Sequence, residues 1–386
     1  MNKEVSLATT LAGIPLSTCV YNASGPRTGS AAALAKIAAS AAGAVLTKSA
    51  TLEQQSGNPQ PRTWHSPSNM ASLNSEGLPN NGIDYYISSS TMEETMQAAC
   101  PPDKPYMVSI SGKTLDDNLK MLDRIAKVQD KISSVELNLA CPNVIGKPII
   151  GYDFDQMKMI LTTISKKKYK FTLGLKLPPY LDSKHLQEAA AIINEHSNMV
   201  GYVVCINTVG NALALCEHSE APIIAANNGL AGLSGPAIKY TALSNVNQMR
   251  RNLVPSIDVV GVGGVETGTD AFLFLLSGAT AVQVGTCHWK EGPKCFDRIC
   301  QELKDLMAEK GYKSIEEVKD KLKPWSKEGA ELSRTLTKKA NSASNATSTP
   351  SIAGSDISRL GLLNMILIVV VAILLADKFG VLQVPE

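Results

Sequence analysis

Residues 133–147 of this chain read Ser133-Ser-Val-Glu-Leu-Asn-Leu-Ala-Cys-Pro-Asn-Val-Ile-Gly-Lys147. The apolar first part predicts a short buried strand, and the polar second part, with its proline and glycine, predicts a loop. At the change from strand to loop, Asn138, Cys141 and Asn143 lie within six positions. Carboxamides donate and accept hydrogen bonds, and a thiol of tuned pKa accepts a proton. A lone cysteine is more often a small buried apolar residue, so the rest of the chain decides whether this is a reaction site.

On both sides of this stretch, apolar runs alternate with helical patterns, which predicts βα units and a parallel sheet. We expect eight strands, at 18–23, 44–48, 106–110, 135–139, 171–176, 201–206, 257–262 and 281–285. We expect helices at 30–40, 115–128, 154–166, 183–196, 238–252, 267–276 and 292–309, with Asp182 and Ser183 as N-cap candidates for the fourth. Eight parallel strands with intervening helices predict an α/β fold, the (β/α)8 TIM barrel.

Polar residues or glycines at seven of the predicted strand ends, the third left aside, could bind a ligand, and the active sites of TIM barrels lie at these C-terminal strand ends. Gly263-Gly264 and Gly285-Thr286 follow the last two strands, where backbone N–H groups and a short helix N-terminus bind phosphate. Glycine pairs also occur simply in tight turns. The presence of both loops after the expected strands favours a phosphorylated cofactor or substrate.

Two lysines, Lys48 and Lys176, end predicted strands inside the barrel. A lysine at such a place can extend to solvent, but Lys176 is enclosed between an apolar strand and Leu-Pro-Pro. An uncompensated buried ammonium is costly. We therefore expect both lysines to face an anion or an electron-rich ligand.

A long insertion, residues 50–105, separates the second and third predicted strands. It contains Asn69-Met-Ala-Ser-Leu-Asn-Ser-Glu-Gly-Leu-Pro-Asn80, which is rich in asparagine, glycine and proline. Long loops on a barrel top are often functional, although an irregular surface excursion has the same composition. The number of carboxamides favours contact with a ligand.

Composition limits the classes of function. The chain has 386 residues, 44% hydrophobic and 19% charged, and a net charge of +2. This balance argues against nucleic acid as a partner, because phosphate binding needs a basic excess. The eight cysteines are scattered without a C-x-x-C pair, which indicates a reducing compartment and no structural zinc.

The two ends of the chain differ in composition. The first residues lack the apolar core of a signal peptide and the arginine-rich pattern of a transit peptide, so we expect a cytosolic start. We predict a catalytic domain over 1–325, a flexible polar linker over 326–358, a transmembrane helix over 359–378 and a short tail over 379–386. The uncharged stretch 360–376 is at the short end of what spans a bilayer. We favour a single-pass C-terminal membrane anchor with the catalytic domain in the cytosol over a core helix or a GPI signal.

Several motifs together resemble one family, the dihydroorotate dehydrogenases, and within it the fumarate-linked class 1A. The resemblance covers roughly residues 4–325. It rests on Asn22-Ala-Ser-Gly25, Lys48-Ser49, Asn74-Ser-Glu-Gly-Leu-Pro-Asn80, Glu136-Leu-Asn-Leu-Ala-Cys-Pro-Asn143, Gly174-Leu-Lys-Leu-Pro-Pro-Tyr180, Asn207-Thr208, Gly261-Val-Gly-Gly-Val265 and Val284-Gly-Thr286.

The resemblance implies three sets of site residues. The catalytic residues would be Cys141, Lys48 and Lys176, with Cys141 as the base. The FMN contacts would be Ala23, Ser24, Lys48, Ser49, Asn138, Lys176, Ile206, Gly232, Gly263, Gly264, Gly285 and Thr286. The dihydroorotate contacts would be Lys48, Asn74, Gly77, Leu78, Asn138, Asn143, Asn207 and Thr208.

The family's reaction agrees with these residue types. Oxidising the ring bond of dihydroorotate to give orotate needs a base for the C5 proton and a hydride acceptor for C6, which are roles for Cys141 and FMN. Lys176 would stabilise the reduced flavin, and asparagines would hold the substrate's imide edge. The resemblance also implies a homodimer, fumarate reduction to succinate, no metal, and a place in pyrimidine (UMP) synthesis.

The chain departs from the family pattern in places. Glu76 stands where the family usually has an apolar residue, residues 225–236 differ from the family's glycine-rich spelling, and class 1A enzymes ordinarily lack a C-terminal anchor. The anchor leaves quinone as an alternative acceptor. Two further alternatives are another FMN-dependent pyrimidine or enoate reductase and a non-catalytic membrane-tethered scaffold.

Overall fold

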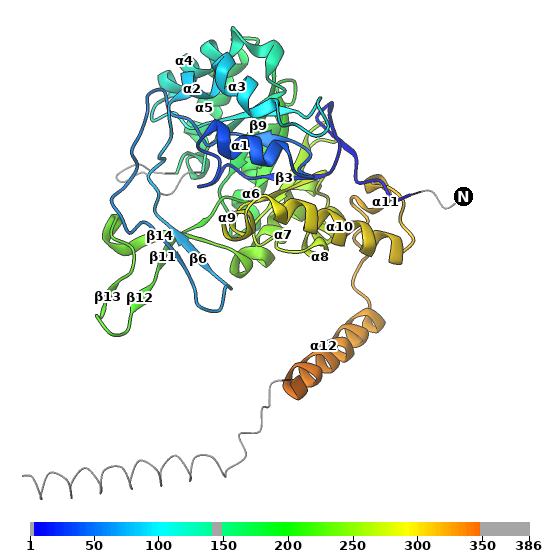
Figure 1. Cartoon of the computed structure of the whole chain (residues 1–386). Coiled ribbons are helices and arrows are strands. Elements are labelled where there is room, and N and C mark those ends of the chain that lie inside the picture. Colours follow the sequence, from blue (N-terminus) through cyan, green and yellow to red (C-terminus); the bar gives the residue numbers. More distant parts are fainter. Residues whose placement is uncertain (1–3, 141–148, 348–386) are drawn as a thin grey trace, which may run out of the picture. The chain divides into compact units, whose positions relative to one another are not determined.

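The structure is a computed structural model that describes residues 4–140 and 149–347. The chain divides into two units, Met1–Leu322 and Lys323–Glu386 (Figure 1). In the first unit, eight parallel strands form one sheet in the order β3-β16-β15-β10-β9-β8-β7-β4. These strands are β3 (Val20–Asn22), β4 (Val45–Leu46), β7 (Tyr106–Ile110), β8 (Ser134–Asn138), β9 (Thr172–Leu177), β10 (Val200–Cys205), β15 (Asp258–Val262) and β16 (Ala281–Val284). Each overlaps a predicted strand, and the TIM-barrel prediction is confirmed.

An asparagine side chain closes the barrel between its first and last strands in the sheet order, β3 and β4. The Asn22 Nδ2 atom donates to the Leu46 carbonyl at 2.6 Å, and the Leu46 N–H donates to Asn22 Oδ1 at 2.9 Å. The Gly43 N–H also donates to the Val20 carbonyl at 2.8 Å. A Cβ atom at Gly43 would lie 1.9 Å from the Thr18 carbonyl oxygen, so only glycine fits this approach. Asn22 is completely buried and therefore acts in the barrel's closure.

Helices cover the outside of the barrel (Figure 1). They are α1 (Ala31–Ala38), α4 (Leu115–Ala126), α5 (Phe154–Ser165), α6 (Ser183–Asn194), α7 (Lys239–Asn252), α8 (Gly268–Leu276), α9 (Thr286–Glu291), α10 (Lys294–Glu309) and α11 (Ile315–Val318). In α10, Phe296, Ile299 and Leu303 are completely buried at helical spacing. Asp182 caps α6 by accepting from the His185 N–H, whereas Ser183 is the first helical residue and not the cap.

A hairpin of β1 (Thr9–Leu11) and β2 (Ile14–Leu16) precedes the barrel in the chain. The Ala12 N–H in its turn donates to Asp258 Oδ2 at 2.8 Å, at the first residue of β15. Parallel strands share one direction, so this hairpin lies at the N-terminal ends of the strands. The opposite, C-terminal ends are left for other segments.

A second, four-stranded antiparallel sheet joins two segments that are far apart in the sequence. The 50–105 insertion contributes β5 (Thr63–His65) and β6 (Ser72–Asn74), and the segment after β10 contributes β11 (Val209–Leu213) and β14 (Leu230–Ser234), in the order β11-β14-β6-β5. The insertion continues into α2 (Ile83–Ile87) and α3 (Ser89–Met96), and a small hairpin pairs β12 (Leu215–Cys216) with β13 (Ala221–Pro222). Short 3-10 helices lie at Gln129–Lys131, Ile150–Tyr152, Asn227–Gly229 and Pro236–Ile238. The insertion is predictable from the sequence, but this sheet is not.

The second unit contains α12 (Lys327–Thr347). Part of the segment predicted as a flexible linker, 326–358, is therefore helical, and the linker's role and bounds stay a prediction. Its alanine, leucine, lysine and glutamate residues favour a helix, and the serine and asparagine content led to the opposite prediction. Within the part of the chain that the structure describes, no helix is long and apolar enough to cross a membrane. The predicted transmembrane helix at 359–378 and tail at 379–386 lie outside the described residues.

Candidate active site

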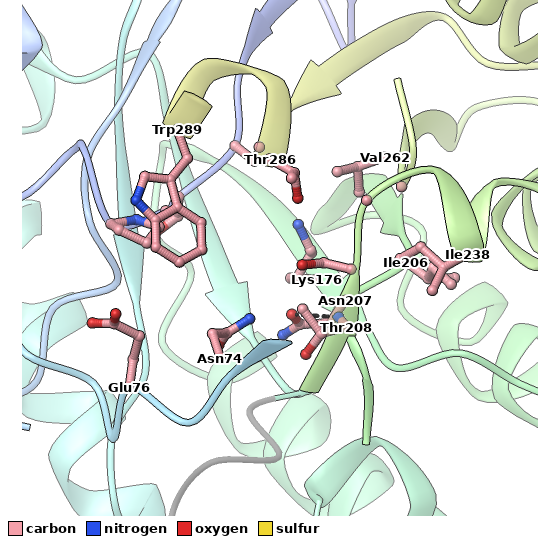
Figure 2. Close-up of a pocket in the computed structure, with 18 of the residues that line it drawn as sticks. Asn74, Glu76, Lys176, Ile206, Asn207, Thr208, Ile238, Val262, Thr286 and Trp289 are labelled. Atoms are coloured by element: carbon pink, nitrogen blue, oxygen red, sulfur yellow. Dashed lines mark hydrogen bonds between the residues drawn. The ribbon is translucent and has the colours of Figure 1, made fainter. Parts of the chain in front are cut away.

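A cavity of about 1040 Å³, counted with its open mouth, lies at the C-terminal ends of the barrel strands. Figure 2 shows Lys176, Asn207 and Thr208 near the middle of the cavity, with Ile206, Ile238 and Val262 on one side and Trp289 and Glu76 on the other. The cavity thus has one apolar wall and a polar centre.

Most predicted site residues line this cavity. They are Ala23, Ser24, Lys48, Ser49, Asn74, Leu78, Asn138, Lys176, Ile206, Asn207, Thr208, Gly263, Gly264, Gly285 and Thr286. They come from loops and strand ends around the whole barrel, so the fold brings the predicted strand-end residues together. The structure does not test their individual roles.

Two predicted site residues that the structure describes, Gly77 and Gly232, do not line the cavity. A Cβ atom at Gly77 would meet the Asn58 side chain at 2.3 Å, and one at Gly232 would meet Thr208 Oγ1 at 2.2 Å. Both glycines therefore make room for a neighbouring side chain, and their assignment as ligand contacts stays a prediction. Cys141 and Asn143 lie outside the described residues.

A hydrogen-bond network connects the strand ends around the polar centre. The Ser49 N–H donates to Ser24 Oγ at 2.6 Å, and the Ser49 hydroxyl lies 2.9 Å from Ser109 Oγ. Asn138 Nδ2 donates to Ser49 Oγ at 3.4 Å, and Asn138 Oδ1 accepts from Asn207 Nδ2 at 3.3 Å. Ser109 belongs to β7, the strand whose end the sequence analysis left without a role. The third predicted strand therefore also supports the site.

Lys176 enters the cavity from β9 and is only 7% exposed. Its Nζ atom donates to Gln283 Oε1 at 3.2 Å, and Gln283 Nε2 donates to Glu136 Oε2 at 2.7 Å. Burial lowers the pKa of Lys176, and the nearby Glu136 carboxylate acts in the opposite direction. The predicted electron-rich partner of Lys176 thus includes a protein amide oxygen.

The glycine wall of the cavity consists of Gly263, Gly264 and Gly285 beside Thr286. Gly264 has φ +71°, and a Cβ atom there would lie 2.8 Å from the Lys239 Cβ, so this position requires glycine. A Cβ atom at Gly285 would have only the Ala23 Cβ, at 3.7 Å, within contact distance. Gly285 therefore faces open cavity, where a ligand can approach the backbone.

The insertion supplies the rim of the cavity through Asn74, Glu76 and Leu78. Asn80 fixes this segment, since its side chain donates to the Leu78 carbonyl and accepts from the Thr51 N–H. Glu76 Oε2 lies 3.5 Å from Arg62 Nε. The unexpected carboxylate at position 76 is thus paired with a cation within the insertion.

Some lining residues were not predicted as site residues. They are Gly25, Pro26, Glu76, Ser234, Gly235, Ile238, Val262, Val265, Glu266 and Trp289. Val262, Val265 and Glu266 lie within four residues of Gly263-Gly264 along the chain, so their position beside a predicted strand end could have indicated them. Ser234 and Gly235 carry no such signal, because the sheet containing β14 was not predicted.

Thr208 has an unsatisfied group. Its Oγ1 atom is buried without a hydrogen-bond partner among the residues that the structure describes. A buried polar group left unpaired costs about 1–3 kcal/mol. A polar ligand group within hydrogen-bond distance of Thr208 Oγ1 would offset this cost.

Comparison with known proteins gives the relationship directly. The sequence model of the dihydroorotate dehydrogenase family matches residues 6–307. This chain belongs to the dihydroorotate dehydrogenase family. It is 44% identical over 301 residues to the dihydroorotate dehydrogenase (fumarate) of Lachancea kluyveri, covering 78% of this chain and 93% of the relative. It is 41% identical to a putative dihydroorotate dehydrogenase A (fumarate) of Streptococcus agalactiae, covering 82% and 99%.

A solved structure of the same family shares the fold. The dihydroorotate dehydrogenase of Eimeria tenella in complex with ferulenol superposes with a TM-score of 0.68 at 20% identity, over 83% of this chain and 89% of that chain. At this identity the likeness concerns the fold alone. The relatives with higher identity identify the chain as an oxidoreductase of the dihydroorotate dehydrogenase family.

Proposed function

We propose that this dihydroorotate dehydrogenase family member oxidises (S)-dihydroorotate to orotate with bound FMN and passes the electrons to fumarate. The observation that carries the proposal is the convergence of two buried lysines, several carboxamides and a glycine wall on one cavity. The names of the relatives support the substrate and the acceptor. The reaction would contribute to pyrimidine (UMP) synthesis.

The residues around the cavity fit FMN. Its ring system has an apolar edge, which suits Ile206, Ile238 and Val262, and a polar edge, which suits Asn138 and Lys176. Its phosphate suits the open backbone at Gly285 and the neighbouring Gly264 and Thr286. The same residues leave the rim, with Asn74, for a second, smaller ligand.

The proposed reaction is balanced in protons and electrons. Dihydroorotate loses a proton from C5 and a hydride from C6, and fumarate gains a hydride and a proton to become succinate. When bound, FMN supplies the hydride acceptor and donor between the two half-reactions. We propose Cys141 as the base for the C5 proton, from its place between Asn138 and Asn143 in the sequence and from the family resemblance.

The described side chains would orient the substrate. Asn207 is held by its Nδ2 bond to the Ala140 carbonyl at 2.9 Å, and its Oδ1 accepts from the Thr208 N–H at 2.8 Å. The side chain is therefore fixed before a ligand binds. Lys48, which is 7% exposed, supplies positive charge for the substrate's carboxylate.

Orotate formation by the full-length chain tests this function. We expect orotate to accumulate faster with fumarate than with a quinone. The variant Cys141→Ala should keep its flavin and lose about 10²–10⁴-fold in rate. The matched control Cys216→Ala changes a thiol on β12 outside the cavity and should keep the parent rate. Faster turnover with quinone than with fumarate would show that quinone is the acceptor. A Cys141→Ala variant that turns over at the rate of the parent protein would exclude Cys141 as the base.

We also propose, from the sequence alone, that residues 360–376 anchor the protein in a membrane with the catalytic domain in the cytosol. Deleting residues 359–386 should move the protein from the membrane fraction to the supernatant without loss of orotate formation. The homodimer implied by the family is a further proposal, which light scattering tests.

A further inference from the structure

A buried carboxylate lies inside the barrel below the cavity. Glu136, on β8, is 1% exposed and does not line the cavity. Its partner Gln283, on β16, is completely buried. In the sheet order, β8 and β16 are four positions apart in a barrel of eight strands, so they face each other across the interior. The bond between Glu136 and Gln283 therefore spans the barrel.

The amide of Gln283 connects this carboxylate to Lys176. An ammonium group can only donate hydrogen bonds, and an ionised carboxylate can only accept them. The Gln283 Oε1 atom must therefore face Lys176 Nζ, at 3.2 Å, and its Nε2 atom must face Glu136 Oε2, at 2.7 Å. Nε2 also donates to the Tyr21 hydroxyl at 3.2 Å. The chain of bonds has one direction, from the lysine at the cavity to the carboxylate below it.

The charge states of Lys176 and Glu136 depend on each other. Burial lowers the pKa of Lys176, and Glu136 is the largest influence that raises it. Burial raises the pKa of Glu136, and Lys176 is the largest influence that lowers it. The other titratable groups near this pair are Tyr21 on β3, Cys205 and Tyr202 on β10, and Lys48 at the cavity wall. Burial raises the pKa of Tyr21, Tyr202 and Cys205, so these three are neutral near pH 7.

We propose that Glu136 is a positioning residue which, through Gln283, keeps the Lys176 ammonium charged and directed at the cavity. A fixed positive charge would then face the cofactor as the cofactor gains electrons. This inference rests on the proposed function, because the ligand beside Lys176 is taken to be FMN. Glu136 itself touches neither cofactor nor substrate in this arrangement.

The midpoint potential of the bound flavin, measured against pH, tests the proposal. In Glu136→Gln, Lys176 loses its counter-charge, so burial should lower the pKa of Lys176 further than in the parent. The variant should show an added pH dependence of the potential as Lys176 loses its proton, with a potential below the parent's at higher pH. The conservative variant Glu136→Asp, which keeps the charge but withdraws the carboxylate from Gln283, should show a smaller added pH dependence than Glu136→Gln.

A double-mutant cycle separates this role from a purely structural one. Glu136→Gln should have no effect on the potential in a Lys176→Gln background, because the group through which Glu136 acts is gone. Equal shifts in both backgrounds would overturn the proposal. Gln283→Leu keeps the charges of Lys176 and Glu136 but removes the hydrogen bonds of both to Gln283. Its midpoint potential should show a smaller added pH dependence than that of Glu136→Gln, and a pH profile equal to the parent's would also overturn the proposal.

The behaviour of the parent protein distinguishes a failure of the proposed function from a failure of the role of Glu136. A parent chain without flavin, or with flavin that dihydroorotate does not bleach, would contradict the proposed function. If the parent protein binds flavin that dihydroorotate bleaches, but the potential shifts of Glu136→Gln and Lys176→Gln are additive, only the role of Glu136 is contradicted.

Discussion

The substitution Gly285→Ala separates ligand binding from folding at the glycine wall. The new Cβ atom would have only the Ala23 Cβ, at 3.7 Å, within contact distance, which is an ordinary van der Waals contact. The φ of Gly285 is −109°, so the backbone is not in the left-handed region. The protein itself should therefore accept the methyl group with little change in its free energy of unfolding.

Bound FMN, in contrast, should not tolerate the added methyl group of Gly285→Ala. The methyl group would occupy the cavity where the backbone is open for the cofactor's phosphate. Overpacking by one methyl group costs about 1–3 kcal/mol, which corresponds to about a 5- to 160-fold weaker Kd for FMN. Titration of the flavin-free protein with FMN, followed by flavin fluorescence, measures this change.

Gly264→Ala is the matched control. Its φ is +71°, and its Cβ atom would lie 2.8 Å from the Lys239 Cβ, so it should lower the free energy of unfolding by about 1–3 kcal/mol. Denaturant unfolding of both flavin-free variants gives the comparison. A Gly285→Ala variant that binds FMN as tightly as the parent would refute the placement of the phosphate at this wall.

Three further substitutions test the fold around the site. Asn22→Ala leaves the buried N–H and carbonyl of Leu46 unpaired and should lower the free energy of unfolding by about 2–6 kcal/mol in urea titrations; a loss below 1 kcal/mol would contradict its role in closing the barrel. Asp182→Ala removes the N-cap of α6 and should cost about 1 kcal/mol in the same assay, whereas an unchanged midpoint would exclude the cap's contribution. Burial and Arg27 lower the pKa of His288 from 6.5 to about 4, so protons bind the unfolded chain preferentially. The parent should therefore lose up to about 3 kcal/mol of stability between pH 6.5 and 4 relative to His288→Gln, and parallel pH profiles would refute this.

The barrel was predictable from the sequence because each strand is a short apolar run that ends in polar residues. The predicted strands match the observed ones to within two residues at most ends, as at β7, where the bounds agree. The strand ends of a parallel barrel meet at one face. This rule alone brought Lys48, Lys176, Asn138 and Gly285 to a common cavity.

The second sheet was not predictable in the same way. Its pairing of β6 with β14 joins Leu73 to Leu233, which are 160 positions apart, and neither strand has a strong alternating pattern of its own. Gly232 was assigned to the ligand from the family resemblance, and in this sheet it makes room for Thr208. Long-range pairing of short strands depends on tertiary contacts that local patterns do not contain.

The visible spectrum of the full-length protein, recorded without oxygen while dihydroorotate and then fumarate are added, tests the central claim most directly. We expect a flavin band that dihydroorotate bleaches and fumarate restores. A protein that purifies without flavin, or whose flavin band dihydroorotate leaves unchanged, would contradict it.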